Sequence, residues 1–265
     1  GAEDLAAFAL DEQMRQAGGE IHAEQRWAQR IGPVEVVPGV LLAAQLEDLQ
    51  GRFNLNDLVD DKGQANEVAV EVFQRLLEAA GLERTWASAF VDWIDSDINQ
   101  LPGGGEDGLY SGETPPYRPP NRVVVTPSEL LALHGFGAER YAKIAPYVTA
   151  LPRGTPINLC TASGLLLDAV TDERQWSGAP DALARNRSGK CFPRKQGFEN
   201  FFRDRKEFDK VNRGLGLEEN SQYFQLRTLT SIGTSEFALY SLLRSESAGP
   251  GGARRVRVVM RSFTE

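Results

Sequence analysis

Six carboxylates lie between Asp92 and Glu113, in a stretch that also contains three consecutive glycines, Gly103–Gly105. No Lys or Arg lies between Arg84 and Arg118. So much like charge in a short segment repels itself unless a cation sits within it, and Ca²⁺ takes about six to eight oxygen ligands. The pattern therefore predicts a calcium site, with a solvated acidic loop as the alternative.

The candidate ligands stand on both sides of the glycines. One pair occupies alternate positions just after a predicted helix, and a second pair follows the glycine hinge, so that carboxylates converge from two sides. The expected ligands are Asp95, Asp97, Glu106 and Asp107, with Asp92 and Asn99 as additional ones. The spacing is not that of an EF-hand, and Mg²⁺ suits the segment less well because it demands near-ideal octahedral geometry.

The sequence contains no arrangement of residues that favours catalysis. Two carboxylates near an aromatic ring could form a glycosidase pair, but nothing marks one of them as the proton donor. Neither His22 nor His134 has a second His, Cys or Ser at a spacing that suits zinc or nucleophilic catalysis. The sequence therefore indicates a non-enzymatic protein.

The chain has two cysteines, Cys160 and Cys191, which enclose a loop of about thirty residues. This arrangement suits an exported protein with a single disulfide. Because cysteine is often simply a buried core residue, two unconnected thiols remain the alternative.

Charge is unevenly distributed along the 265 residues, whose net charge is −8. The acidic total argues against a protein that binds phosphate backbones. Between Arg185 and Arg213, however, ten Lys or Arg stand against four Asp or Glu and alternate with phenylalanines. Such a segment suits an amphipathic helix, or a surface for single-stranded nucleic acid. Leu130–Gly137 resembles half a helix-hairpin-helix, so a nucleic-acid-binding protein of that type is the alternative function.

Hydrophobic periodicity predicts the elements that position these residues. We expect a helix over residues 2–30, on which Leu5 and Phe8 form an apolar stripe that Ile21 extends. A strand is expected over 34–49. Further helices are expected over 67–80, 86–94, 128–133, 138–148 and 158–170, the last capped by Thr161.

The last forty-five residues alternate apolar and polar side chains. This pattern predicts antiparallel strands over 222–231, 236–244 and 254–263, with a Gly-Pro turn over 247–252. No apolar run reaches the roughly 18 residues that a membrane span needs, and no signal peptide is visible. Gly1-Ala2 resembles a cloning remnant, so we expect an upstream segment in the natural protein.

An ordered set of motifs resembles the K-type minor pseudopilin family of the type II secretion pathway. The matching segments are GRFNLNDL at 51–58, WID-D at 93–97, PGGGED-x-x-Y at 102–110, PPYRPPN at 115–121, SELLALHGFG at 128–137 and LP-x-x-x-PIN-x-x-TAS at 151–163. Each motif is modest alone, but the fixed order over most of residues 1–210 is specific.

The resemblance implies an α+β fold: a pilin-like N-terminal helix on an antiparallel β-sheet, with a large inserted α-helical domain. We expect residues 1–60 to form the pilin-like helix and first strand, 61–213 the insertion with its calcium loop, and 214–265 the remaining strands. The family commonly has Asn where this chain has Cys160, a departure that favours the Cys160–Cys191 bridge.

The resemblance also implies a function and a place in the cell. Such proteins cap the tip of the periplasmic pseudopilus with the I- and J-type minor pseudopilins, anchored in the inner membrane by an N-terminal segment, and they bind calcium in this acidic region. The first helix is the expected partner surface, through Leu5, Phe8 and Ile21.

Overall fold

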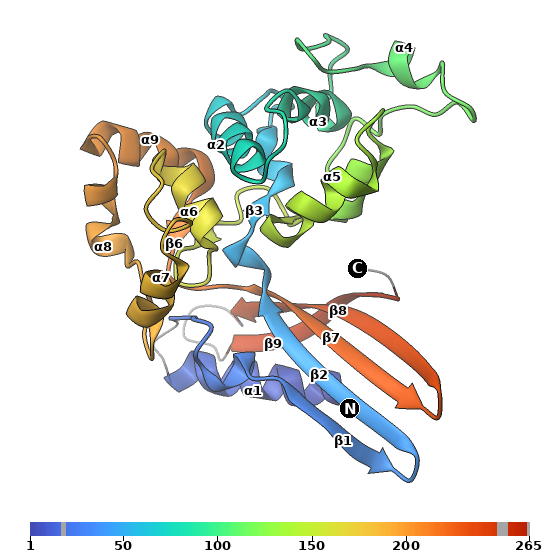
Figure 1. The fold of residues 1–265 in the computed structure, drawn as a ribbon, viewed down its shortest axis with the longest axis vertical. Coiled ribbons are helices and arrows are strands. Elements are labelled where there is room, and N and C mark those ends of the chain that lie inside the picture. Colours follow the sequence, from blue (N-terminus) through green and yellow to red (C-terminus); the bar gives the residue numbers. More distant parts are fainter. Residues whose placement is uncertain (17–19, 248–253, 264–265) are drawn as a thin grey trace.

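A five-stranded antiparallel sheet forms the lower half of the molecule in Figure 1. The computed structural model describes residues 1–16, 20–247 and 254–263. The sheet order is β1 (Ile31–Val37), β2 (Val40–Asp48), β7 (Tyr223–Ile232), β8 (Ser235–Ser247) and β9 (Arg254–Ser262). The three predicted C-terminal strands are thereby confirmed, while the predicted turn over 247–252 lies almost wholly outside the described residues.

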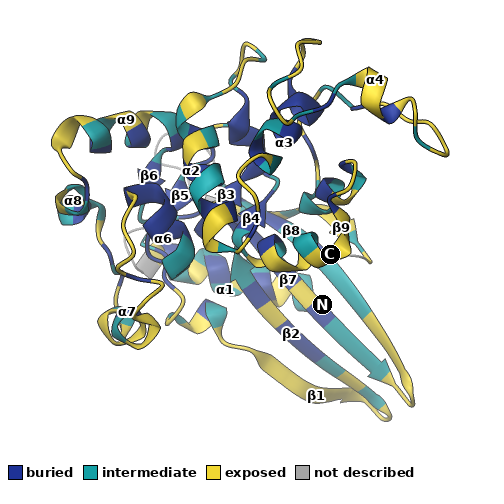
Figure 2. Ribbon diagram, turned by 45° about the horizontal axis from the view of Figure 1, so that its top comes forward, coloured by how far each residue is buried: buried dark blue, intermediate teal, exposed yellow. Residues whose placement is uncertain are grey.

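The single strand predicted over 34–49 is wrong, because this segment is a hairpin of β1 and β2. Val37 pairs with Val40, and Pro38 and Gly39 form the turn between them, with Gly39 at φ +80°. Such a tight reversal suits a Pro-Gly pair, since proline fixes its own φ and glycine adopts positive φ without steric cost. Every residue of β1 is exposed, as Figure 2 shows along the length of this strand.

Helix α1 (Ala2–Gln16) packs across one face of the sheet. Ala6, Leu10 and Met14 follow a helical spacing and lie buried against β2, β7 and β8, with Leu46, Phe224, Leu226 and Leu243 on the sheet side. At the N-terminal end the Arg261 guanidinium donates two hydrogen bonds of 2.7 Å to the carboxylate of Glu3. Apolar burial and this paired fork fix the helix on the sheet.

The predicted helix over residues 2–30 is too long. After α1, the described residues 20–25 are not helical, and a short 3₁₀ turn covers Arg26–Ala28. Glycine is a poor helix former, and two glycines stand at positions 18 and 19 of the sequence. The backbone N–H of Ile21 instead donates to the carbonyl of Glu219 (2.9 Å), and the Ile21 side chain is fully buried.

A mostly helical region lies between β2 and β7 and occupies the upper half of Figure 1. Its helices are α2 (Glu67–Ala79), α3 (Trp86–Ile94), α4 (Asp107–Tyr110), α5 (Gly137–Ile144), α6 (Gly164–Thr171), α7 (Pro180–Arg187), α8 (Lys195–Phe198) and α9 (Arg205–Leu215). Two short parallel pairs, β3 (Phe53–Asn54) with β4 (Val148–Thr149) and β5 (Ile157–Asn158) with β6 (Leu217–Glu218), tie its ends together. It has a hydrophobic core of its own, separate from the core under α1.

The clearest periodic segments were predicted correctly, and the shorter ones only in part. Helices α2 and α3 match the expected ranges, whereas residues 127–132 form a 3₁₀ helix. Helix α6 begins at Gly164 with Ser163 as its cap, so the predicted cap at Thr161 is wrong. The Thr161 hydroxyl is engaged elsewhere, because it donates to the carboxylate of Asp48 at 2.6 Å.

Buried polar side chains join the helical region to the sheet. Asp48, at the end of β2, accepts hydrogen bonds from Asn158 (2.9 Å), Thr161 (2.6 Å) and Ser221 (2.7 Å). The same Asn158 amide donates to the Ile21 carbonyl at 2.9 Å. This junction therefore fixes four separate segments of the chain in one place, because each buried polar group there finds a partner.

Candidate metal centre

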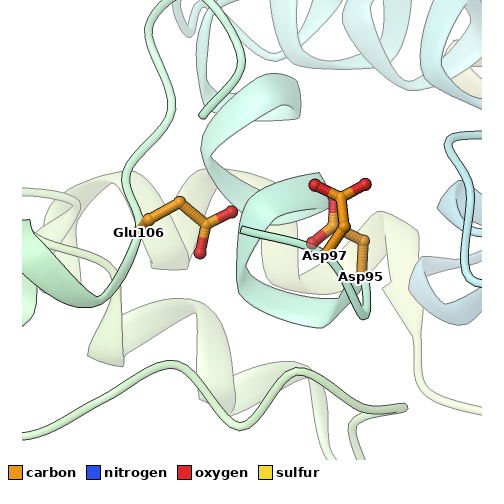
Figure 3. A group of neighbouring side chains, drawn as sticks. All are labelled: Asp95, Asp97 and Glu106. Carbon is orange, nitrogen blue, oxygen red and sulfur yellow. The ribbon is translucent and has the colours of Figure 1, made fainter. Parts of the chain in front are cut away.

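Three carboxylates come together where α3 ends and the glycine-rich loop returns. Asp95 follows the last residue of α3, Asp97 lies two residues further on, and Glu106 precedes α4. One oxygen of each lies within 4.8 Å of the others. Figure 3 shows Glu106 directed across the gap toward the two aspartates. Two bonds of about 2.4 Å between a cation and its oxygens span about this distance, so the three fit around one hard divalent ion.

The local sequence builds this arrangement through Asp92. Its side chain is fully buried on α3 and accepts a hydrogen bond from the backbone N–H of Leu101 (3.1 Å), which holds the returning loop against the helix. Gly104 passes so close that a Cβ there would lie 2.0 Å from Oδ2 of Asp92. The glycine is therefore required by close approach, and it lets the chain bring Glu106 back to Asp95.

Several oxygens of the cluster are buried without a hydrogen-bond donor. They are Oδ1 of Asp95 and both carboxylate oxygens of Glu106. A buried carboxylate oxygen that finds no donor costs free energy unless a cation or a proton compensates it. The donor set and its unsatisfied oxygens thus fit a metal ion, with Asp95, Asp97 and Glu106 as the residues able to hold it.

The pKa values of the cluster also show that ionised carboxylates are unfavourable there. Burial, with the charges of Asp97, Asp92 and Glu106 added, raises the pKa of Asp95 to about 7. Burial and the charge of Asp92 raise the pKa of Glu106 to about 7 as well. Carboxylates that repel one another in a poorly hydrated site hold protons when no cation is bound.

The remaining expected ligands lie at different distances from this cluster. Asp92 is not one of the three and accepts its hydrogen bond from the backbone N–H of Leu101. The backbone N–H of Asn99 donates to Oδ1 of Asp97 (2.7 Å), which orients that carboxylate. Asp107 is exposed and faces Arg118, with Oδ2 at 3.6 Å from Nε. The structure therefore brings three of the six together and leaves Asp107 outside.

Aromatic rings close one side of the acidic loop. Trp93, on α3, meets Tyr110 at 5.1 Å between ring centroids, and Tyr117 packs on both. The Tyr117 hydroxyl donates to the carbonyl of Ala132 at 2.8 Å. Aromatic pairs contribute about 0.5–1.5 kcal/mol each beyond their buried area, so this cluster stabilises the loop that carries Glu106.

The two cysteines and His134, which the sequence also singled out, have structural partners. Cys160 and Cys191 form a disulfide, with their Cα atoms 4.6 Å apart. Arg140, which follows the hairpin-like segment Leu130–Gly137, donates to the carbonyls of Gly135 (3.2 Å) and Phe136 (3.1 Å) and stacks on Trp86. His134 bonds Glu113. None of the described helices has the length and hydropathy that a membrane crossing requires.

The sequence did not predict the buried polar junction around Asp48 and its donor Asn158. Their separation of 110 positions leaves no local signal. For Asn54 and Asn56 the sequence does offer a signal, because both lie in an Asn-rich segment after β2. Asn56 donates to the carbonyls of Val124 and Leu151, both at 2.9 Å, and so anchors two distant loops.

Comparison with known proteins gives a consistent result. The family described as "Type II secretion system (T2SS), protein K" matches residues 51–153. The type II secretion system protein K of Pseudomonas aeruginosa is 31% identical over 273 residues, which cover 99% of this chain and 78% of that protein. Protein K of Klebsiella pneumoniae is 36% identical over 158 residues, which cover 57% of this chain and 48% of that protein.

A solved structure resembles the whole described fold. It belongs to the crystal structure of the GspK–GspI–GspJ complex from the type 2 secretion system of enterotoxigenic Escherichia coli, with a TM-score of 0.80 at 28% identity. The match covers 98% of this chain and 92% of that one. The helix packed on an antiparallel sheet, together with the sequence and structural similarity to protein K, defines the class of protein as a pseudopilin. A pseudopilin is a structural protein and not an enzyme. The chain belongs to the type II secretion system protein K family, whose members are minor pseudopilins.

Proposed function

We propose that this protein caps the tip of a periplasmic pseudopilus in a complex with minor pseudopilins of the I and J types, and so supports protein export. The observation that carries the proposal is the match of almost the entire chain to the GspK–GspI–GspJ structure. We assign residues 1–60 and 214–265 to a pilin-like module and residues 61–213 to the inserted helical domain.

The shape of the molecule supports a terminal position. In Figure 1 the helical insertion lies at one end of the sheet and extends well beyond it. A fibre grows when each subunit offers a surface on which the next can stack. An insertion of this size over one end of the pilin-like module leaves no room for a further subunit there, which suits the last position in the fibre.

The outer face of α1 supports the proposed partner surface. Leu5 and Phe8 point away from the sheet and are 66% and 63% exposed, one turn of helix apart. Large apolar side chains grouped on an unpaired helix face are typical of an interface. Ile21 lies in the interior, so we now propose Leu5 and Phe8 without it.

The decisive experiment mixes this chain with its I- and J-type partners at micromolar concentration and measures the mass of the complex. We expect a 1:1:1 complex that the double variant Leu5→Lys/Phe8→Lys fails to form. The matched control is Val125→Lys, which adds a charge at a position of the insertion that is 67% exposed. A double variant that assembles as well as the control would exclude this face, and absence of any ternary complex would overturn the tip assignment.

We further propose that the acidic cluster binds Ca²⁺ through Asp95, Asp97 and Glu106. Backbone carbonyls and water would complete the coordination of six to eight oxygens. The unsatisfied oxygens of Asp95 and Glu106 support this proposal. Bound calcium would neutralise the loop and fix it against α3, and Asp92 would act by holding Leu101.

Thermal unfolding tests the calcium proposal. Calcium at about one hundred times its dissociation constant stabilises the folded state by about 2.7 kcal/mol, so Tm should rise by roughly 5–10 °C over its value in EDTA. Asp95→Asn and Glu106→Gln should lose most of this rise. Asp107→Asn is the matched control and should keep it, because Asp107 faces Arg118. Identical curves in EDTA and in millimolar calcium would exclude the site.

We also propose that this chain is the periplasmic part of a protein anchored in the inner membrane. The Cys160–Cys191 disulfide supports this location, since disulfides persist in the oxidising periplasm.

A further inference from the structure

A cavity of about 350 Å³ lies beside the disulfide, between α6, α7 and the segment that follows α1. Its apolar wall consists of Leu165, Trp176 and Leu183, with Pro180 and Ala184. The volume lies at the lower end of the range for small-ligand sites, about 300–1,000 Å³. It suits a group the size of one or two amino-acid residues.

A guanidinium without a counter-ion, that of Arg187, lines this cavity. Arg187 donates from Nε to the carbonyl of Phe192 (2.7 Å) and from Nη2 to the carbonyls of Leu159 (2.9 Å) and Ala162 (2.7 Å). All three acceptors are neutral, and among the described residues Arg187 has no ion pair. Burial lowers the pKa of Arg187 to about 10, although an arginine remains protonated at neutral pH.

The two N–H groups on Nη1 of Arg187 have no protein acceptor among the contacts found for this side chain. Three of the five N–H groups are therefore used to hold the chain, and two remain for a ligand. These two N–H groups share one nitrogen and diverge, so each can donate a single charge-assisted hydrogen bond to a carboxylate. A partly buried cation without a counter-charge is costly, so an anion that reaches it gains binding free energy.

A histidine also lines the cavity. His22 is 9% exposed and lines the cavity, and its Nδ1 has no hydrogen-bond partner. Lys190 lies at the rim, while Glu24 is a lining carboxylate and is exposed. Nearby Glu20 is already paired with Arg194 at 2.8 Å. The first turn of α6, at Gly164 and Leu165, adds partial positive charge.

We propose that this cavity binds an organic carboxylate with a short apolar chain, its carboxylate on Arg187 and its chain against Trp176 and Leu183. Both the C-terminus of a peptide that ends in an apolar residue and a small aliphatic acid have this chemistry. The inference goes beyond the proposed function, because it concerns a site on the insertion that contributes neither to the acidic cluster nor to the outer face of α1.

Titration of the whole chain, labelled with ¹⁵N and followed by NMR, tests the proposal with three probes. They are a tripeptide that ends in leucine with a free carboxylate, the same tripeptide with a C-terminal amide, and hexanoate. We expect the free acid to shift the indole resonance of Trp176 with a dissociation constant below about 1 mM, and the amide to bind at least about tenfold more weakly. A tripeptide that binds more tightly than hexanoate identifies a peptide C-terminus, and the reverse order identifies a small acid.

Two substitutions on α7 separate the cavity from a general surface effect. Ala184→Phe places a ring in the cavity and keeps Arg187, and it should abolish binding. Asn186→Phe places the same ring at an exposed position of α7 outside the cavity wall, and it should leave binding unchanged. Equal affinity for acid and amide, binding that survives Ala184→Phe, or no shift with any probe at about 5 mM would each overturn the proposal.

Discussion

Asp57 shows how a single buried carboxyl can govern the response of this fold to pH. It accepts a hydrogen bond from the backbone N–H of Gly154 (2.7 Å), and burial raises its pKa to about 7. The folded state therefore holds a proton that the unfolded chain releases near pH 4. The stability due to this proton is fully present below that pH and is lost as the pH rises through about 7.

We therefore expect Asp57→Asn to change the pH dependence of stability. Asparagine keeps an acceptor for Gly154 and carries no titrating group. Between pH 5 and pH 8, the wild type should lose about 2 kcal/mol of unfolding free energy relative to the variant, with urea unfolding as the measurement. Subtracting the variant cancels the other buried carboxyls, so parallel pH profiles would show that Asp57 stays ionised.

Residue types predicted the acidic cluster better than they predicted the polar junction. Carboxylates crowded into a segment free of Lys and Arg are visible in the sequence, and the structure brings Asp95, Asp97 and Glu106 together. Which carboxylates converge depends on the path of the loop, and Asp107 leaves the cluster for Arg118. The partners of Asp48 could not be predicted from the sequence, because they lie more than one hundred positions further along the chain.

Among the elements, α2 and α9 show how closely two helices can pack through one glycine. A Cβ at Gly214 on α9 would lie 2.8 Å from Cβ of Val68 on α2. The side chain of Asn66 caps the start of α2 and also donates to the carbonyl of Gly214 at 3.0 Å. The two helices are therefore held together at a point that has no space for a side chain.

Gly214→Ala should consequently destabilise the insertion. Overpacking of this kind costs about 1–3 kcal/mol, even though alanine is the better helix former. Denaturant unfolding would measure the effect. Gly108→Ala is the matched control on α4, where an added methyl group meets no atom within 4 Å, and it should be neutral or slightly stabilising. Equal stability of both variants would mean that α2 and α9 can move apart freely.

Element predictions succeeded where periodicity was long and failed at chain reversals. Helix α2 buries five apolar residues at helical spacing, which is a strong signal. The hairpin of β1 and β2 was read as one strand, because both sides of the Pro38-Gly39 turn are rich in valine and leucine. The predicted helix over 2–30 ran too far although Gly18 and Gly19, which are poor helix formers, are visible in the sequence, whereas the tertiary bond from Ile21 to Glu219 is not.

At the scale of the whole molecule, the order of the motifs predicted the architecture better than secondary-structure propensity did. The fixed sequence of short motifs implied a helical insertion between sheet strands, and β2 and β7 indeed lie side by side with the helices between them in the chain. Periodicity alone could not have paired these strands, since strand pairing is a long-range property of the folded chain.

That pairing has a consequence for how the protein acquires its structure. Asp48 on β2 pairs with Phe224 on β7, so the chain between the two strands forms one large loop. Closing a loop of this length costs conformational entropy, and we therefore expect this pairing to form slowly. We expect refolding to be hierarchical: in pulsed hydrogen exchange, the amides of α2 and α3 gain protection before those of β2 and β7. Simultaneous protection would contradict this order. During synthesis the first two strands would then wait, unpaired on one edge, until the C-terminal strands leave the ribosome.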